Sequence, residues 1–381
     1  MKRLYWRPRQ VSQSIIVFMA AFSLLGLATV EYFRVDAPQE DLALKMQAAE
    51  LSNEMMEAIR NEKLHLGLRI SSDVDPAATG MIGELMTPVT TLSGRLGAKQ
   101  TSTNPNLAAV VVEMLLKAGV GQGDLVAVGY SGSFPGMNVN VLAALKTIGA
   151  RPVILTSVGS SQWGANSPRF LWIDMETMLF EEHFIPFRSV ASSIGGYEDL
   201  GIGLGDEARK MVRESIAKNK LDRLEAEDFA SAIDERMNIY RKQAGSQAYK
   251  AYINVGGGAV SVGKTIGKRA YKPGLNRSAS RATLQIDSIM TRFMRSDVPV
   301  IHLVEMDQIA TLYGMPLKPQ QQPAVGEGGV FKQPRRSRLL ILAVLLAILG
   351  SLRIFVLTDF GHRFMKGRGS RKITGHPEPM V

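Results

Sequence analysis

The chain has 381 residues, 45% hydrophobic and 21% charged, so it holds enough apolar material for a sizeable core; because it lacks cysteine, it cannot form disulfides or thiolate metal sites. Its net charge of +10 comes from the two ends, where four cations precede Val11 and ten cations follow Phe331 against two acids. The remaining 31 cations and 33 acids nearly balance, which argues against a nucleic-acid partner.

Two apolar segments near the ends predict membrane helices. Residues 1–13 form a basic tail, and residues 14–33 form the first segment, whose uncharged run is just long enough to span a hydrocarbon core of about 30 Å. No small-residue cleavage site follows it, so we expect a retained anchor rather than a signal peptide. Residues 339–358 form the second segment, in which Arg353 is expected near one membrane face because a cation at mid-bilayer costs about 3 kcal/mol. Residues 359–381 form a second basic tail.

The cations around the first segment predict its orientation. Four precede it, and only Arg34 and Lys45 follow closely, which favours a cytoplasmic N-terminus. The large central domain is then expected on the outer side of the cell inner (cytoplasmic) membrane, with the C-terminal tail returning inside. The basic cluster from Lys332 to Arg338 argues against this orientation, because it would lie outside.

Three regions are expected between the two membrane segments. Residues 37–66 predict a juxtamembrane helix, because apolar residues recur on one face at spacings of three and four. Residues 80–313 predict an α/β domain, with a division into two lobes near residues 200–250 as an option. Residues 314–338, rich in Pro, Gln and Gly, predict a linker to the second membrane segment.

The clearest α/β pattern begins at Asn104-Pro105, which predicts a helix start. A buried strand over 125–130, a second helix from Ser133 and a strand over 152–157 follow, and together they predict a right-handed parallel unit. Further strands are expected at Phe170–Ile173, Ala251–Val255 and Val300–Val304. The predicted fold class is α/β, an open, mostly parallel doubly wound sheet between two transmembrane helices.

Gly/Ser-rich turns follow the predicted strands and indicate a ligand site. Ligands bind at the carboxyl ends of parallel strands, where small residues let the backbone approach and exposed N–H groups attract anions. The stretch from Lys264 to Arg281 adds six cations and no acid before Asp287. The predicted ligand-binding residues are Ser131, Gly132, Ser133, Ser160, Ser161, Gly256, Gly257, Gly258, Lys264 and Thr265. The alternative is a set of ordinary turn glycines beside a solvated basic face.

A nucleotide site is a competing hypothesis for the same stretch. Gly258 to Thr265 reads GAVSVGKT, which matches the phosphate-binding loop pattern, with Lys264 for the phosphates and Thr265 for Mg²⁺. Only residues 266–271 are available for the helix that should follow, before Pro273-Gly274, so the helix is too short. A domain facing outward would also meet no ATP.

A serine hydrolase is a second competing hypothesis. Gly129 to Ser133 resembles a nucleophile elbow in the required strand-turn-helix setting, with Ser131 as the nucleophile. Ser133 replaces the final glycine, and the base would be His183 or His302, between which no motif selects. Otherwise Ser131 and Ser133 serve to cap the next helix.

An acidic cluster after the strand candidate at residue 170 is the third possible site. Asp174 and His183 are its candidate catalytic residues, and its other members are Glu176, Glu181 and Glu182. Their spacing fits no standard metal signature, and a capping Asp with an acidic helix face explains them better. We therefore predict no metal site, and the catalytic residues and cofactor stay unassigned, with Ser131, Asp174 and His183 as candidates.

Several strings in the chain resemble the poly-γ-glutamate system protein family, namely TSTNPNLAAVVVEMLLKAG, VAVGYSGSFPGMNVNVLAALK, SVGSSQWGAN, WIDMETML and INVGGG. The resemblance runs from about Thr87 to Leu275 and includes the N-terminal anchor. It implies a bacterial membrane protein associated with the poly-γ-glutamate synthase, acting in making, exporting or anchoring this polyanion. It supplies no catalytic residues.

These observations lead to one functional hypothesis and two alternatives. The leading hypothesis is an accessory membrane component of a poly-γ-glutamate (capsule) biosynthesis and export system, which binds the anionic polymer or a precursor at the Gly/Ser-rich strand ends. Its expected partners are the membrane, the synthase subunits and the polymer. The first alternative is an enzyme, either a nucleotide-binding protein or a serine-type envelope hydrolase. The second is a scaffold subunit without a ligand site.

Overall fold

The computed structural model describes residues 13–358, so most of the predicted N-terminal tail 1–13 and all of the C-terminal tail 359–381 lie outside the described residues. The chain divides into two compact units. One unit combines residues up to Ala37 with those from Lys332 onward, and the other is Pro38–Phe331.

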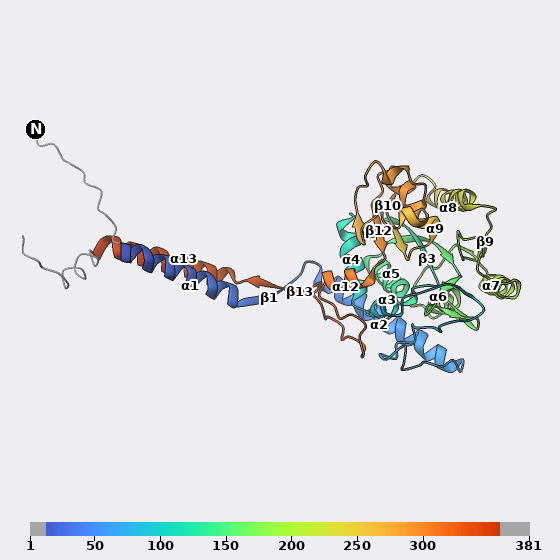
Figure 1. The fold of residues 1–381 in the computed structure, drawn as a ribbon, viewed down its shortest axis with the longest axis horizontal. Helices are drawn as coiled ribbons and strands as arrows, with labels where there is room; N and C mark the ends of the chain where they lie inside the picture. Colours follow the sequence, from blue (N-terminus) through green and yellow to red (C-terminus); the bar gives the residue numbers. More distant parts are fainter. Residues whose placement is uncertain (1–12, 359–381) are drawn as a thin grey trace, which may run out of the picture. The chain divides into compact units, whose positions relative to one another are not determined.

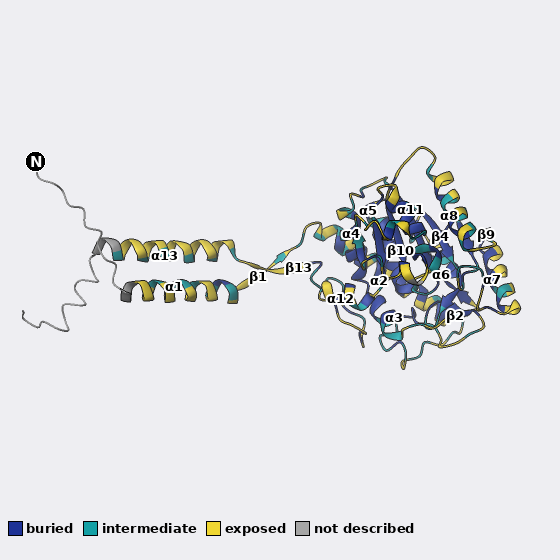
Figure 2. Cartoon of the chain, turned by 45° about the horizontal axis from the view of Figure 1, so that its top comes forward, coloured by how far each residue is buried: buried dark blue, intermediate teal, exposed yellow. Residues whose placement is uncertain are grey.

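The first unit pairs the two apolar helices (Figure 1). It contains α1 (Gln13–Tyr32), β1 (Arg34–Pro38), β13 (Lys332–Arg336) and α13 (Arg338–Thr358), with β1 and β13 hydrogen-bonded to each other. The helices pack closely at Gly26, where an added Cβ would lie only 2.6 Å from Val344 Cγ1. Arg336 Nε donates to Glu31 Oε2 at 2.7 Å beside the two strands. Most of the residues in both helices are exposed (Figure 2).

Only one helix in the described part of the chain is long and apolar enough to cross a membrane. It is α13, where an 18-residue window over Arg338–Phe355 has a mean hydropathy of 2.2. The apolar stretch of α1, Ile16–Tyr32, is shorter. Two spanning segments were predicted, and the C-terminal segment alone has the length and composition that a membrane span requires.

The second unit is built on a seven-stranded sheet in the order β11-β12-β10-β3-β4-β8-β9. Six of the strands run parallel, and β11 is antiparallel to β12 at one edge. The mostly parallel α/β sheet predicted from the sequence is thereby confirmed. The strands are β3 (Leu125–Ser131), β4 (Arg151–Ser157), β8 (Ala191–Ser193), β9 (Asp222–Leu224), β10 (Tyr249–Val255), β11 (Gly274–Asn276) and β12 (Val300–Leu303).

Helices cover both faces of this sheet (Figure 1). Val126 and Val128 of β3 point into one apolar cluster, and Leu125 and Ala127 point into the other, as the two-residue period of a strand requires. The first cluster includes α2 (Leu42–His65), α4 (Leu107–Lys117), α5 (Pro135–Ile148), α6 (Trp172–Glu181), α7 (Asp206–Lys218) and α12 (Met306–Leu312). The second includes α8 (Phe229–Ala244), α9 (Ala259–Val262) and α11 (Ile289–Arg295).

Short elements complete the unit near the carboxyl edge of the sheet. The strand β2 (Thr90–Leu92) pairs in parallel with β5 (Ser160–Ser161), outside the main sheet. Two short α-helices, α3 (Leu96–Ser102) and α10 (Lys264–Gly267), each have less than two turns. The 3-10 helix η1 (Thr283–Gln285) is a single turn.

The prediction of a strand at Phe170–Ile173 is wrong. Only β7 (Phe170–Leu171) is extended, and it pairs antiparallel with β6 (Asn166–Ser167) rather than joining the main sheet. Helix α6 begins at once, because the Asp174 carboxylate accepts a hydrogen bond from the Leu171 amide at 2.9 Å and so caps the first turn.

The segment predicted as a linker, residues 314–338, is largely part of the second unit. Met315, Val330 and Phe331 are buried in its apolar core. The Lys45 ammonium of α2 also donates to the Val330 carbonyl at 3.3 Å. Pro, Gln and Gly in this segment therefore shape a coil packed on the domain, and only residues after 331 leave it.

Candidate functional site

The strand order creates a crevice at the carboxyl edge of the sheet. The chain proceeds from β3 through β4 and β8 to β9, and then returns to place β10 on the other side of β3. The loops after β3 and β10 therefore leave in opposite directions, which is where open α/β sheets bind ligands. A cavity of about 550 Å³ lies there, lined by residues that follow β3, β4, β8, β10 and β12.

Six of the ten predicted ligand-binding residues line this cavity, namely Ser131, Ser133, Ser161, Gly257, Gly258 and Lys264. Gly132, Ser160 and Gly256 belong to the same turns but do not line it. Ser160 instead holds two turns together, since its hydroxyl donates to the Gly132 carbonyl at 3.0 Å. The side chain of Thr265 lies outside the described residues.

A buried lysine that the sequence analysis missed lies in the cavity wall. Lys99 of α3 is 2% exposed, and its Nζ lies 2.8 Å from Ser161 Oγ and 4.2 Å from the centre of the Phe134 ring. Nζ also donates to the Ser133 carbonyl oxygen. No carboxylate in the described part of the chain pairs with it, and burial lowers the pKa of Lys99 to about 7.

The opposite wall, after β10, offers groups suited to an anion. The amide N–H groups of Gly257 and Gly258 donate to no acceptor among residues 13–358. The Lys268 ammonium lies beside Gly257, 3.9 Å from the position that a Gly257 Cβ would take, and it forms no ion pair within the described chain. Lys264, in contrast, is engaged, because its Nζ lies 2.7 Å from Glu198 Oε1 and 4.4 Å from the Phe229 ring centre.

The loop after β8 forms the third wall. Asp199 accepts hydrogen bonds from the hydroxyls of Ser157 at 2.9 Å and Ser193 at 2.7 Å, and it forms a buried ion pair with Arg236 of α8. Asp199 is a non-glycine residue with a φ of 67°, a strained left-handed conformation that this network holds in place. Its carboxylate and the Arg236 guanidinium neutralise each other, so neither is free for a ligand.

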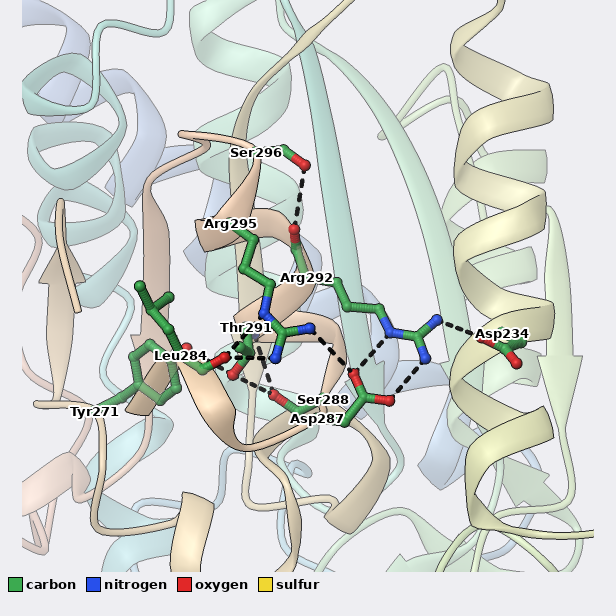
Figure 3. A network of polar contacts seen from close by, with 9 residues as sticks. All are labelled: Asp234, Tyr271, Leu284, Asp287, Ser288, Thr291, Arg292, Arg295 and Ser296. Atoms are coloured by element: carbon green, nitrogen blue, oxygen red, sulfur yellow. Dashed lines mark hydrogen bonds and ion pairs between the residues drawn. The ribbon is translucent and has the colours of Figure 1, made fainter. Parts of the chain in front are cut away.

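A network of polar contacts that begins at the cavity wall holds the segment that carries Lys268 (Figure 3). Tyr271, which lines the cavity, shares a hydrogen bond of 2.9 Å with Thr291 of α11. Arg292 of α11 forms a two-pronged contact with Asp287, at 2.8 and 2.7 Å, and an ion pair with Asp234 of α8. The Arg292 hydrogen bonds hold the pKa of the Asp287 carboxyl below its ordinary value. Helices α8 and α11 and the segment that leads into α11 are thus fixed to one another.

The phosphate-binding loop match does not form such a loop. Residues 259–262 are helical as α9, and the amides of Ser261, Val262 and Gly263 donate to carbonyls within the motif at 2.8–3.1 Å. The following helix, α10, has four residues. Amides already used in this way cannot cradle phosphates, and Lys264 is paired with Glu198, so the geometry contradicts the nucleotide hypothesis at this motif.

The nucleophile elbow predicted at Ser131 lacks a base in the structure. Ser131 Oγ accepts a hydrogen bond from the Ser133 amide at 3.3 Å, and no hydrogen bond joins it to either histidine within the described part of the chain. His183 is exposed at the end of α6. His302 does line the cavity, but its Nδ1 lies 3.0 Å from Asn254 Nδ2, and burial lowers its pKa to about 4.

The acidic cluster is structural. Asp174 caps α6 and also accepts from Asn219 Nδ2 at 2.8 Å and pairs with Lys218 at 3.1 Å. Glu176 is buried against Tyr130. Among residues 13–358, no group of three or more His, Asp or Glu side chains could hold a metal ion.

The cavity thus combines an unpaired cation and free amides on its β10 side with a serine and a buried lysine on its β3–β4 side. This arrangement can bind an anionic group and can place a carbonyl carbon beside a hydroxyl. No family model, curated protein or solved structure matches the chain.

Proposed function

We propose that the protein is an accessory component of a poly-γ-glutamate (capsule) biosynthesis and export system, and that its cavity binds a carboxylate of the polymer or of a precursor. The observation that carries this proposal is the Lys268 ammonium, which lies beside Gly257 at the cavity without an acidic partner in the described chain. A charged group that is left unpaired beside free amides favours an anion there.

The size and charge of the site suit this ligand. The cavity of about 550 Å³ lies in the usual range for small-ligand sites, about 300–1,000 Å³, and is open enough for a chain end or a few residues. Poly-γ-glutamate carries one carboxylate per unit. The central part of the chain is nearly neutral overall, so attraction of a polyanion must come from local cations such as Lys268 rather than from net charge.

The proposal includes the membrane. We propose that α1 and α13 both insert, as two packed spans, in the cell inner membrane with the second unit on its outer side. The apolar exposed faces of both helices support insertion, because such large apolar surfaces are rarely left in water. The expected partners are the synthase subunits of the same membrane and the polymer, with no nucleic acid.

Charge reversal at Lys268 tests the ligand. In the detergent-solubilised full chain, Lys268→Glu should weaken binding of poly-γ-glutamate about tenfold or more, because an attractive contact becomes repulsive. The control is Lys210→Glu, which makes the same change in net charge on the exposed face of α7. The affinity of the wild-type protein should fall as salt rises. Equal affinities of the two variants would refute this site.

A further inference from the structure

Ser161 and Lys99 form a pair that the proposed binding function does not use. Their side-chain atoms, Oγ and Nζ, lie 2.8 Å apart in the wall of the cavity. The Ser161 amide donates to Ser133 Oγ at 3.1 Å, which fixes the serine backbone. Lys99 donates to the Ser133 carbonyl and lies over the Phe134 ring, so its own position is fixed by three contacts.

Burial keeps much of the Lys99 amine uncharged at neutral pH. Its pKa is lowered to about 7, and no acid in the described chain stabilises the ammonium. An uncharged amine has a lone pair that can accept the proton of a neighbouring hydroxyl. Donation of an N–H to the Ser133 carbonyl leaves this lone pair available for Ser161.

A second buried lysine, Lys63, has a structural role in the same protein. The Lys63 side chain of α2 donates to two backbone carbonyls, Gly80 at 3.1 Å and Ile82 at 2.8 Å. Burial lowers the pKa of Lys63 as well, but Asp75 and Glu84 favour its charged form and so oppose this shift. Lys99 has neither acid and faces a hydroxyl in an open cavity. The contrast separates Lys99 from a lysine that only satisfies backbone groups.

We propose that Ser161 is a nucleophile and Lys99 its general base, and that the protein cleaves an amide or ester bond next to an anionic group. Serine paired with lysine is an established arrangement for acyl transfer. The carboxylate-binding wall at Lys268 would hold the anionic group while Ser161 faces the carbonyl, which suits a γ-linked amide beside an α-carboxylate. The identity of this substrate rests on the proposed function, whereas the serine–lysine pair does not.

The reaction balances with water as the only co-reactant. Ser161 Oγ attacks the carbonyl carbon and gives its proton to Lys99 Nζ, and the resulting ammonium protonates the nitrogen as the C–N bond breaks and the amine leaves. The acyl group is then an ester of Ser161. Water attacks this ester and gives a proton to Lys99, the bond to Oγ breaks, Oγ recovers a proton from Lys99, and a carboxylic acid leaves.

The test is covalent labelling of the full chain in detergent with a small fluorophosphonate, mapped by mass spectrometry. We expect the label on Ser161, with a labelling rate that rises with pH up to about 7 and then levels. Ser161→Ala should carry no label at this position. Lys99→Arg should be labelled at least about 100-fold more slowly, because arginine stays charged. Ser246→Ala and Lys210→Arg, both at exposed positions, should label like the wild type.

Two outcomes would overturn the pair. One is an unlabelled Ser161 in the wild-type protein between pH 6 and 9, and the other is an unchanged rate in Lys99→Arg. Circular dichroism of each variant shows whether it is folded, and Lys99→Met provides a second variant, which is uncharged and should also lose the label. Labelling of Ser161 in a protein that fails to bind poly-γ-glutamate would support the pair and refute only the proposed ligand.

Discussion

Replacing Lys99 with methionine should make the folded protein more stable at pH 7. An ammonium with a pKa near 7 instead of 10.5 implies a protonation cost of about 4 kcal/mol at pH 7, at about 1.4 kcal/mol per pKa unit. The variant loses hydrogen bonds to Ser133 and Ser161, worth about 1 kcal/mol each. The expected net gain in the free energy of unfolding at pH 7 is about 2 kcal/mol.

The sign of this effect depends on pH. Between about pH 7 and 10.5 the unfolded Lys99 holds its proton while the folded one has lost it, so wild-type stability rises with pH over this window. The advantage of Lys99→Met should therefore shrink by about 1.4 kcal/mol per pH unit and reverse at about pH 9. Denaturant unfolding of both proteins from pH 7 to 10 measures this, with Lys210→Met as the exposed control. A difference that stays constant across this range would contradict a buried, readily deprotonated Lys99.

Replacing Trp172 with alanine should destabilise the second unit by about 3–5 kcal/mol. Trp172 is fully buried and packs edge-on against Tyr130, with ring centres 5.5 Å apart. Tyr130 directly precedes Ser131 at the end of β3. Its Nε1–H has no hydrogen-bond partner in the described chain, so Trp172→Phe removes an unsatisfied donor while keeping a ring. The phenylalanine variant should therefore lose only about 1 kcal/mol. Equal losses in the two variants would show that the ring is not what supports β3.

The central strands of the sheet could be predicted from the sequence because they are continuous apolar runs. Residues 125–130 and 152–157 and their helices carry enough local pattern to predict a parallel unit. The last two strands on one side of the sheet, β8 and β9, with sequences ASS and DRL, were missed. They are short and polar, and they are strands only because β4 supplies a partner for β8 and β8 for β9.

The location of the cavity could also be predicted, and its lining only in part. Glycine and serine turns mark the carboxyl ends of strands in any sequence, which is why Ser131, Ser161 and Gly257 were found. Lys99 was missed because its burial depends on tertiary packing of α3 beside the turns at Ser133 and Ser161, which no local pattern reveals.

The pairing of charges is a second feature that the sequence does not reveal. A sequence motif predicted that Lys264 binds the ligand. Glu198, which lies in a loop more than sixty residues earlier in the chain, instead forms an ion pair with it. Lys268, four residues later and outside the motif, has no such partner in the described chain. Which cations of a basic stretch are free is thus a property of the fold rather than of the stretch.

The most direct test of the cavity as the functional site is photo-crosslinking to γ-linked glutamate oligomers. Tyr197, which lines the cavity and is 49% exposed, can be replaced by benzoylphenylalanine with little change in shape, and Leu312 on α12, which is 77% exposed and outside the cavity lining, provides the control position. We predict saturable crosslinking at position 197 that Lys268→Glu abolishes, and none at position 312. Equal yields at the two positions, or none at 197, would contradict a polymer site in this cavity.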